Sequence, residues 1–489
     1  MELGEIIRSL PQYQCEKTLD GIHISNVEKD HRQVTSNTLF ICIHGYTVDG
    51  HQFAAEAVTR GAVAIVAEKP LSLDVPVIIV PNTKRVLPQV ASFFYDYPTT
   101  KMKMIGVTGT NGKTSVTHIL EEILQAATFR TGLIGTIGMR IQQKYEPVNN
   151  TTPDALVLQK SFDQMVQKQI DVGIMEVSSH ALDQGRVHGT DFDLAVFTNL
   201  TQDHLDYHQT MKDYLFAKSL LFSQLGNSYS KSKPKYAIIN IDDPAAHQLI
   251  KSTAQPVITY GIEQEATFRA NNITLFEQGV HFDMETPEGT ISMNSHLIGK
   301  FSVYNMLAAA ATAYYAGISI TTIKEVIEQT KGVKGRFQPV LTEHDFGVIV
   351  DYAHTPDSLE NVLQTIKNVC HGNVYAIVGC GGDRDRNKRP QMADITCRYA
   401  DKAIFTSDNP RSEDPLAIID DMVVDLDATN YQVIADRKQA IRTAIQQATS
   451  KDMVLIAGKG HETYQVIGDH TYEFDDEKVA LQVLQEEKK

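Results

Sequence analysis

Residues 106–114 read Gly-Val-Thr-Gly-Thr-Asn-Gly-Lys-Thr, and this stretch joins a predicted strand, which begins at Met102, to a predicted helix. The helix is indicated by an apolar stripe at helical spacing, formed by Val116, Ile119, Leu120, Ile123 and Leu124. Glycines in such a turn let backbone N–H groups approach phosphate oxygens, and the helix N-terminus adds partial positive charge. The stretch therefore predicts a phosphate-binding loop.

Two side chains of this loop have expected roles. Lys113 would reach the outer phosphates of ATP, and the Thr114 hydroxyl would ligate Mg²⁺. The strict phosphate-loop pattern places glycine at position 107, where this chain has valine. The alternative is an ordinary glycine-rich turn, but Gly-Lys-Thr between a strand and a helix favours nucleotide binding. We therefore expect an ATP site that includes Gly109, Thr110, Asn111, Gly112, Lys113, Thr114 and Ser115.

Around this loop, apolar strand-like runs alternate with helical patterns along nearly the whole chain, which predicts an α/β fold with mainly parallel sheets. A length of 489 residues exceeds what one hydrophobic core usually serves. Seams near residues 96–98 and 331–336 divide the chain into three predicted domains. Their expected limits are 1–100, 101–335 and 336–489.

The composition excludes several classes of protein. A net charge of -15 disfavours a general nucleic-acid binder or a protein of anionic membrane surfaces. No apolar run is long enough to span a bilayer, so we expect no membrane insertion. Five scattered cysteines without a C-x-x-C pair indicate reduced thiols, and residues 1–10 lack the apolar core of a signal peptide. We expect a cytoplasmic protein.

Many of the predicted strands end in polar or glycine-rich turns. Such turns follow Ile105, Met175, Phe197, Val350, Val378 and Ala457. Open parallel sheets bind their ligands beyond the carboxyl ends of the strands. The binding sites are therefore expected at these turns.

One lysine interrupts a predicted apolar helix face. Lys218 lies on the stripe formed by Met211, Tyr214, Leu215, Leu221, Phe222 and Leu225. A buried ammonium is costly unless it is paired or loses its charge. A neutral amine reacts with CO₂ to give a carbamate, which is an anionic oxygen ligand. The alternative is a lysine that extends along the helix to reach solvent.

Two polar segments supply further candidate metal ligands. Glu176 follows a predicted strand, and a carboxylate there can hold the Mg²⁺ that bridges nucleotide phosphates. Residues 203–208 read Asp-His-Leu-Asp-Tyr-His. Each segment alone has an ordinary alternative: a solvated glutamate at a strand end, and a polar loop with a helix cap.

Several motifs in order along the chain resemble those of the Mur ligase family. They are Thr108 to Thr114, Glu176-Val177-Ser178-Ser179-His180-Ala181-Leu182, residues 203–208, Lys218, Gly335-Arg336-Phe337 and Asp351-Tyr352-Ala353-His354-Thr355-Pro356. The resemblance spans nearly the whole chain, and independent motifs in the same order make it specific.

This resemblance implies three α/β domains: a UDP-binding domain, a central ATPase-like domain with a parallel sheet, and a C-terminal Rossmann-like domain. It implies that Lys218 is carbamylated and ligates Mg²⁺ together with Thr114, Glu176 and His204. Asn305, Arg336 and Asp351 are expected to contact ATP from the other side of the cleft.

Within the family, the chain most resembles the member that adds meso-2,6-diaminopimelate to a UDP-linked muramoyl dipeptide in peptidoglycan precursor synthesis. The implied dipeptide contacts are Asn150, Thr151, Thr152, Ser178, Gln184 and Arg186. The implied diaminopimelate contacts are Arg384, Asp408, Asn409, Pro410, Arg411, Gly458 and Glu462.

The charges of this last set fit the amino acid. Arg384 and Arg411 can pair with its distal carboxylate, and Glu462 with Asp408 can receive an ammonium. The alternative for either arginine alone is a surface residue on a polar loop.

One segment departs from the family pattern. Such enzymes usually carry Asp-Ser-Arg in the UDP domain, with the serine serving the nucleotide, whereas this chain reads Asp30-His31-Arg32. We expect UDP binding but assign no residues to it.

The alternative functions are a lysine-adding or folylpolyglutamate-type ligase, and a non-catalytic ATP-binding regulator. We expect a monomer whose partners are its small-molecule substrates.

Overall fold

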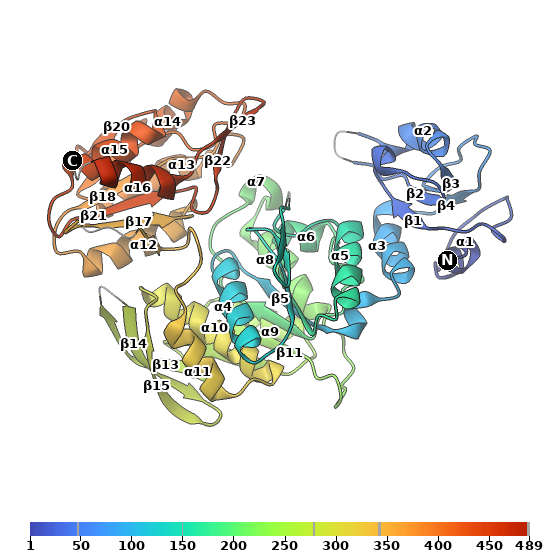
Figure 1. The fold of residues 1–489 in the computed structure, drawn as a ribbon, viewed down its shortest axis with the longest axis horizontal. Helices are drawn as coiled ribbons and strands as arrows, with labels where there is room; N and C mark the ends of the chain where they lie inside the picture. Colours follow the sequence, from blue (N-terminus) through green and yellow to red (C-terminus); the bar gives the residue numbers. More distant parts are fainter. Residues whose placement is uncertain (46–47, 149, 277–278, 341–343, 487–489) are drawn as a thin grey trace. The chain divides into compact units, whose positions relative to one another are not determined.

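The computed structural model describes residues 1–45, 48–148, 150–276, 279–340 and 344–486. Figure 1 shows the chain as a ribbon with its helices and strands labelled. The chain divides into two compact units. The first unit comprises Met1–Gly106, Phe129–Ala195 and Ser223–Lys235, and the second comprises Val107–Thr128, Val196–Phe222 and Tyr236–Lys489. Strands β5 (Lys103–Thr108) and β10 (Leu194–Phe197) contribute residues to both units.

The first unit begins with a four-stranded parallel sheet of order β1-β2-β3-β4. Its elements are α1 (Leu3–Arg8), β1 (Asn26–Glu28), β2 (Thr38–Ile41), α2 (Ala54–Thr59), β3 (Ala62–Ala67), β4 (Val77–Ile79) and α3 (Thr83–Phe94). The wholly apolar run of β3 is expected of a strand covered on both faces. Separate apolar clusters do cover it, one built with α1 and α3 and the other with α2.

A second group of elements in this unit carries the polar turns after Met175. It contains β6 (Thr131–Ile134), β7 (Met139–Ile141), β8 (Lys144–Glu146), α5 (Ala155–Gln167), β9 (Val172–Glu176) and α6 (Ser179–Asp183). The strand order is β9-β6-β7-β8, with β6 and β9 parallel. Asp154 caps α5 and Ser178 caps α6, each through its side-chain oxygen.

The second unit contains the helix predicted after the glycine-rich loop. Elements up to residue 329 are α4 (Lys113–Ala126), α7 (Leu205–His208), α8 (Met211–Ser223), β11 (Tyr236–Asn240), α9 (Ala246–Ser252), β12 (Val257–Gly261), β13 (Phe268–Phe276), β14 (Gly279–Thr286), β15 (Gly289–Ser295), α10 (Lys300–Ala316) and α11 (Ile320–Gln329). The strand order is β15-β14-β13-β12-β11-β10. The apolar stripe of α4 is buried, as its spacing predicts.

The rest of the second unit is built on a six-stranded sheet of order β16-β17-β21-β18-β19-β20. Its elements are β16 (Gln338–Pro339), β17 (Gly347–Asp351), α12 (Pro356–Val369), β18 (Val374–Val378), α13 (Lys388–Tyr399), β19 (Lys402–Phe405), α14 (Pro415–Val423), β20 (Tyr431–Val433), α15 (Arg437–Gln447), β21 (Met453–Ala457), β22 (Tyr464–Ile467), β23 (His470–Glu473) and α16 (Asp476–Glu486). All strands from β17 to β21 in this sheet run parallel.

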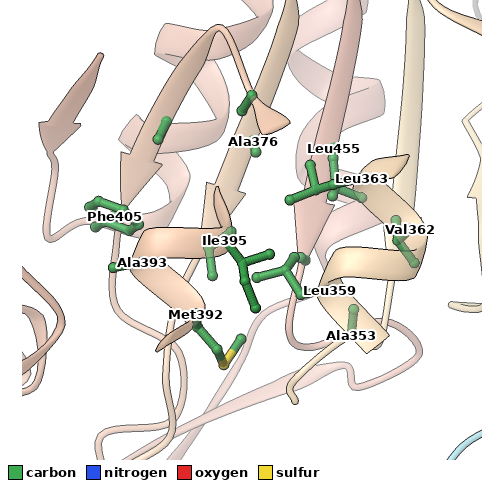
Figure 2. Close-up of a cluster of buried hydrophobic side chains, with 14 of the residues drawn as sticks. Ala353, Leu359, Val362, Leu363, Ala376, Met392, Ala393, Ile395, Phe405 and Leu455 are labelled. Carbon is green, nitrogen blue, oxygen red and sulfur yellow. The ribbon is translucent and has the colours of Figure 1, made fainter. Parts of the chain in front are cut away.

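Helices cover both faces of this sheet. Leu359 of α12 and Met392 of α13 pack with Leu455 of β21 in one cluster (Figure 2). A second cluster joins α15 and α16 to the opposite side chains of the same strands, such as Ile456. Burial on both faces explains the continuous apolar runs of β18 and β21. It also leaves the carboxyl ends of the strands as the place for polar groups.

The predicted strands and helices are found, together with antiparallel strand pairs that the sequence does not predict. Strands β13, β14 and β15 pair antiparallel, whereas the sequence predicts mainly parallel sheets. The pairs β6–β7, β7–β8 and β16–β17 are antiparallel as well. Fully buried side chains alternate with partly buried or exposed ones in β13 and β14, so these strands lack the continuous apolar signal of the parallel strands. The antiparallel hairpin of β22 and β23 was also not predicted, and β23 is wholly exposed.

Candidate functional site

The predicted phosphate loop lies between β5 and α4, as the sequence indicates. Gly109 and Gly112 have φ of +148° and +85°, a region that favours glycine. A β-carbon at Gly109 would lie 1.8 Å from Thr198 Oγ1, and one at Gly112 would lie 2.4 Å from Asn305 Oδ1. The loop therefore needs glycine at both positions.

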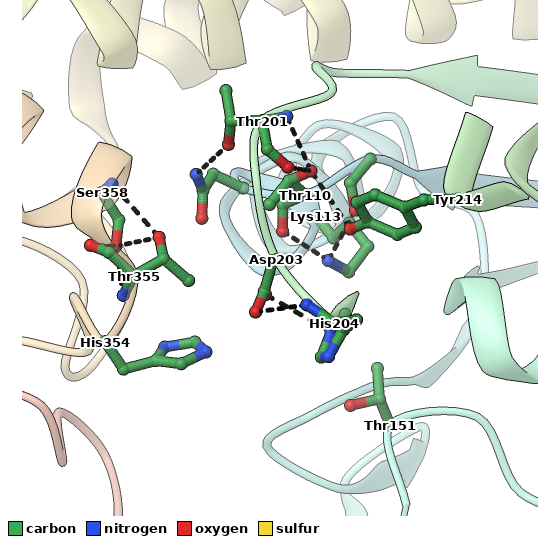
Figure 3. A network of polar contacts seen from close by, with 12 residues as sticks. Thr110, Lys113, Thr151, Thr201, Asp203, His204, Tyr214, His354, Thr355 and Ser358 are labelled. Atoms are coloured by element: carbon green, nitrogen blue, oxygen red, sulfur yellow. Dashed lines mark hydrogen bonds and ion pairs between the residues drawn. The ribbon is translucent and has the colours of Figure 1, made fainter. Parts of the chain in front are cut away.

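The Lys113 ammonium lies against this loop (Figure 3). Its Nζ donates to the backbone oxygens of Gly109 and Thr110, at 2.9 and 2.8 Å. The Thr110 hydroxyl lies 3.1 Å from the Tyr214 hydroxyl of α8. The positive charge is thus held at the N-terminus of α4, where an anion would bind.

A cavity of 380 Å³ lies beside the loop, within the second unit. The lining includes six residues of the predicted ATP set: Asn111, Gly112, Ser115, Asn305, Arg336 and Asp351. It also includes residues that sequence reasoning missed, among them Asn240, Asp242, Tyr304 and Asp357. Asn240 ends β11 and Asp242 follows it, so the strand-end pattern that located the other polar turns could have located these two.

Arg336 and Asp351 each make hydrogen bonds at the cavity. Arg336 Nη2 donates to Thr114 Oγ1 at 3.1 Å, and its guanidinium lies 4.3 Å from the centre of the Tyr352 ring. The Asp351 carboxylate accepts from the backbone N–H groups of Phe337 and Ala353, both at 2.6 Å. Burial nevertheless raises the pKa of Asp351, although these hydrogen bonds and the Arg336 charge oppose the rise.

Asp357, in the first turn of α12, ties this helix to the phosphate loop. Its Oδ2 accepts from Asn111 Nδ2 at 2.8 Å and from Thr201 Oγ1 at 3.2 Å. Burial raises the pKa of Asp357, which the two hydrogen bonds counteract. These partners are 246 and 156 residues away in sequence, and no local pattern could reveal them.

Lys218 is buried, as its place on the apolar stripe of α8 predicts. It is 1% exposed, and its Nζ lies 4.3 Å from the centre of the Tyr214 ring. Burial lowers its pKa well below the usual value, the Lys113 charge lowers it further, and only Asp203 acts in the opposite direction. The environment therefore favours a neutral amine, which is the form that reacts with CO₂.

Asp203 and His204 precede α7 in the same unit. His204 adopts a φ of +56°, and its Nε2 lies 3.4 Å from Asp203 Oδ2. Burial opposes ionisation of Asp203, but the charges of His204, His354 and Lys388 lower its pKa to about 2. Figure 3 shows the His354 ring turned toward this loop, and burial lowers the pKa of His354 to about 4. Sequence reasoning did not assign His354.

The predicted dipeptide contacts are brought together in the first unit. Thr152 is the hub: its Oγ1 donates to the backbone oxygen of Glu176 at 2.8 Å and accepts from Ser178 N at 3.0 Å. Its own carbonyl accepts from Arg186 Nη1 at 2.9 Å. Arg186 Nε and Nη2 both donate to Gln184 Oε1, at 2.9 and 2.7 Å.

The remaining two residues of that set adjoin the hub. Thr151 Oγ1 lies 3.1 Å from Thr136 Oγ1, and Asn150 is exposed at the start of the segment. The Thr136 N–H and hydroxyl donate to the Glu176 carboxylate, at 2.9 and 3.0 Å. Glu176 is fully buried. Among the described residues, no group of three or more His, Cys, Asp or Glu side chains is arranged to hold a metal ion.

The predicted amino-acid contacts gather at the carboxyl ends of β18, β19 and β21. The Asn409 amide donates to Glu462 Oε2 at 2.8 Å, and a β-carbon at Gly458 would lie 2.6 Å from Asp408 Oδ2. Arg411 Nη1 donates to the Gly382 carbonyl at 2.8 Å. These strands are neighbours in the sheet, which explains why segments far apart in sequence meet here.

Two other predicted residues of this set lie in the adjoining turns. Pro410 is buried between Asn409 and Arg411 in the same turn. Arg384 lies on the turn after β18, where its Nη1 donates to the backbone oxygen of Asp383 at 3.1 Å. The turn and the Arg411 segment are joined by Glu413, whose Oε1 accepts from Asp383 N at 2.6 Å.

The segment that departs from the family pattern forms a short turn. Asp30 caps it and pairs with Arg32, with Nη2 and Oδ2 2.7 Å apart. The His31 ring stacks on Phe53 at 4.3 Å between centroids. These contacts are all within the protein, and they do not indicate which residues would bind the uridine nucleotide.

Comparison with known proteins identifies the relatives of this chain. Three family models match it: the Mur ligase family catalytic domain over 23–95, the Mur ligase middle domain over 107–313, and the Mur ligase glutamate ligase domain over 335–460. Two curated relatives carry the name UDP-N-acetylmuramoyl-L-alanyl-D-glutamate–2,6-diaminopimelate ligase. The one from Oceanobacillus iheyensis is 53% identical over 490 residues, or 99% of each chain. The one from Bacillus cereus is 54% identical over 461 residues, or 94% of each.

Solved structures agree with the sequence matches. A structure of a ligase of the same name is 32% identical, covers 100% of this chain and 99% of that one, and has a TM-score of 0.72. In the described part of the chain, no helix is both long and apolar enough to cross a membrane.

Proposed function

Because the chain belongs to the Mur ligase family, with its three-domain α/β fold, we propose that it is an ATP-dependent ligase of peptidoglycan precursor synthesis. It adds 2,6-diaminopimelate to the D-glutamate γ-carboxylate of UDP-N-acetylmuramoyl-L-alanyl-D-glutamate. The observation that carries the proposal is identity above 50% with diaminopimelate ligases over the whole chain. The polar groups at the ends of β18, β19 and β21 supply charges suited to that amino acid.

The reaction has two steps. A γ-carboxylate oxygen attacks the γ-phosphorus of ATP, so that a new O–P bond forms, the bond to ADP breaks, and an acyl phosphate results. The amine of diaminopimelate then attacks the acyl carbon. A C–N bond forms, the C–O bond to phosphate breaks, and the amine loses a proton. The protein must position three substrates and neutralise phosphate charge.

Residues of the second unit serve ATP in this proposal. Lys113 exchanges its carbonyl partners on the loop for phosphate oxygens, and the N-terminus of α4 adds backbone N–H groups for the same oxygens. Asn305, Arg336 and Asp351 contact the nucleotide from the other side of the cavity. The rigid hydrogen bonds of Asp351 support this role, because they orient its carboxylate before the nucleotide arrives.

Mg²⁺ is the proposed cofactor, with ligands from Thr114, Glu176, His204 and carbamylated Lys218. The buried Glu176 carboxylate is of the type that this hard cation prefers. The buried, weakly basic Lys218 amine suits carbamylation, which adds an anionic oxygen ligand. When bound, Mg²⁺ would neutralise charge that develops on the phosphate oxygens.

The hydrogen-bonded cluster around Thr152 is proposed to bind the muramoyl dipeptide. Arg186 carries the charge suited to the carboxylates of that substrate, and Ser178 with Gln184 can bind its amides. Thr151 and Asn150 lie at the outer end of the same segment. The mutual hydrogen bonds support the proposal because they fix these side chains before the substrate binds.

Selection of diaminopimelate over lysine is assigned to Arg411 with Arg384. Diaminopimelate has a distal carboxylate that lysine lacks, and an arginine left without that partner in a closed pocket disfavours lysine. Glu462 and Asp408 receive an ammonium, and Asn409, Pro410 and Gly458 shape the turns that present them. The fixed Nη1 of Arg411 supports the role, because it orients the guanidinium.

Three further features complete the proposal. The protein is placed in the cytoplasm, which its five free cysteines support. It is expected to act as a monomer. The proposed domain limits are 1–100, 101–335 and 336–489. The three family matches, at 23–95, 107–313 and 335–460, support a division into three parts.

Phosphate release tests this function against its alternatives. A ligase releases phosphate efficiently only when ATP, the muramoyl dipeptide and the amino acid are all present. A regulator that binds ATP would show no dependence on the two acceptors, and a folylpolyglutamate-type ligase would not respond to the muramoyl dipeptide. Release that ignores either acceptor contradicts the proposal.

A further inference from the structure

A buried lysine without an assigned role lies behind the proposed amino-acid pocket. Lys459 follows β21, and its side chain is 0% exposed. Its Nζ lies 3.2 Å from Glu462 Oε2 and 3.2 Å from Asn409 Oδ1. A buried ammonium is costly unless it is paired and hydrogen-bonded, so this arrangement needs both partners.

The three side chains form a closed triangle. Asn409 Nδ2 donates to Glu462 Oε2 at 2.8 Å, while Asn409 Oδ1 also accepts from Val466 N at 2.9 Å. The amide orientation follows from these contacts, because the opposite one would set the NH₂ group against two donors. The triangle thus joins the turns after β19 and β21, and Asn409 links it to Val466 of strand β22.

The charges around the triangle are unequal. Glu462 and the buried Asp408 contribute two carboxylates, and burial with the Asp408 charge raises the pKa of Glu462 while Lys459 lowers it. The nearby Arg437–Asp476 ion pair is fully buried, with Nη2 and Oδ2 2.7 Å apart, and it adds no net charge. Lys459 therefore offsets one of the two carboxylates and leaves one negative charge for a ligand.

We propose that Lys459 is a positioning residue that orients Glu462 and Asn409 and leaves the pocket with charge for a single substrate ammonium. The inference rests on the proposed function and deepens it. Lys459 acts through Glu462, and the substrate ammonium takes the remaining charge. Diaminopimelate then supplies one distal ammonium for this site and one distal carboxylate for Arg411.

The test compares KM values in the full-length enzyme for Lys459→Met, Glu462→Gln and the double variant. Each single change is expected to raise the KM for diaminopimelate roughly tenfold or more, with the KM for ATP within about threefold of wild type. The double variant should match Glu462→Gln within about threefold, because Lys459 acts through that carboxylate. Lys478→Met, which removes only an exposed ion pair with Glu473, is the matched control.

The outcomes are separable. An unchanged KM for diaminopimelate in Lys459→Met, equal increases for both substrates, or effects that multiply in the double variant would each overturn the role of Lys459. If Lys459→Met does not fold, the double variant, which keeps the net charge of the wild-type cluster, is compared with Glu462→Gln by the same criterion. A wild-type enzyme that uses diaminopimelate while the variants show no KM change refutes only this inference. A wild type that does not use diaminopimelate refutes the proposed function as well.

Discussion

The burial of Lys218 could be predicted from the sequence. Its helical spacing among apolar side chains predicted burial, and it is 1% exposed with a lowered pKa. We predict that Lys218→Ala folds but loses activity by roughly a hundredfold or more, because a charge-stabilising group near the phosphates is removed. Activity assays with thermal unfolding check this. Lys212→Ala, an exposed lysine on the same helix, should be active.

Chemical rescue sharpens this prediction. Formate or acetate added to Lys218→Ala should restore part of the activity by replacing the missing carbamate oxygens. An active Lys218→Ala enzyme without additive would show that no carbamate is needed.

Residues such as Asp357 and Tyr304 could not be predicted from the sequence pattern, as Lys218 was, because their roles depend on contacts made only after the chain folds.

At the scale of elements, the phosphate loop was predictable because its signal is local. We predict that Gly112→Ala raises the KM for ATP roughly tenfold or more, because strain and displacement of Asn305 together cost about 1–3 kcal/mol. Gly226→Ala is the control, since Gly226 has φ +82° but a β-carbon there meets no atom within 4 Å. Steady-state kinetics on both variants check this. If the two variants have the same KM for ATP, the contact between residue 112 and Asn305 has no role in ATP binding.

Other elements were predictable only in part. The parallel strands β17, β18 and β21 could be predicted from their continuous apolar runs. The turns after β18 and β21 carry residues of the predicted amino-acid pocket. Strands β13 to β15 lack such runs, because partly buried or exposed side chains interrupt them. The hairpin of β22 and β23 was missed too, yet Val466 in it fixes Asn409.

At the scale of the whole molecule, His461 links stability to pH. Burial, and then the charges of Arg336, His118, Lys334 and Lys459, lower its pKa to about 3. The unfolded chain binds the proton near pH 6.5, so the stability contributed by neutral His461 is lost as pH falls from about 6.5 toward 3. Between pH 6.5 and 5 this amounts to at most about 2 kcal/mol.

The prediction is checked by thermal unfolding of wild type and His461→Asn at pH 7.5 and 5. The difference isolates His461 from the other titrating groups. The decrease in Tm on acidification should be smaller in the variant. An identical decrease in both proteins would mean that His461 is protonated equally in the folded and unfolded states.

The measurement that most directly tests the central claim is mass spectrometry of the ligation product. The enzyme receives ATP, Mg²⁺, the UDP-linked muramoyl dipeptide, and equal concentrations of diaminopimelate and lysine. We predict that the diaminopimelate product dominates, and that Arg411→Ala lowers kcat/KM for diaminopimelate more than about tenfold through loss of a charge-assisted hydrogen bond. A lysine product in comparable amount, or no ligated product at all, would contradict the assignment of this enzyme.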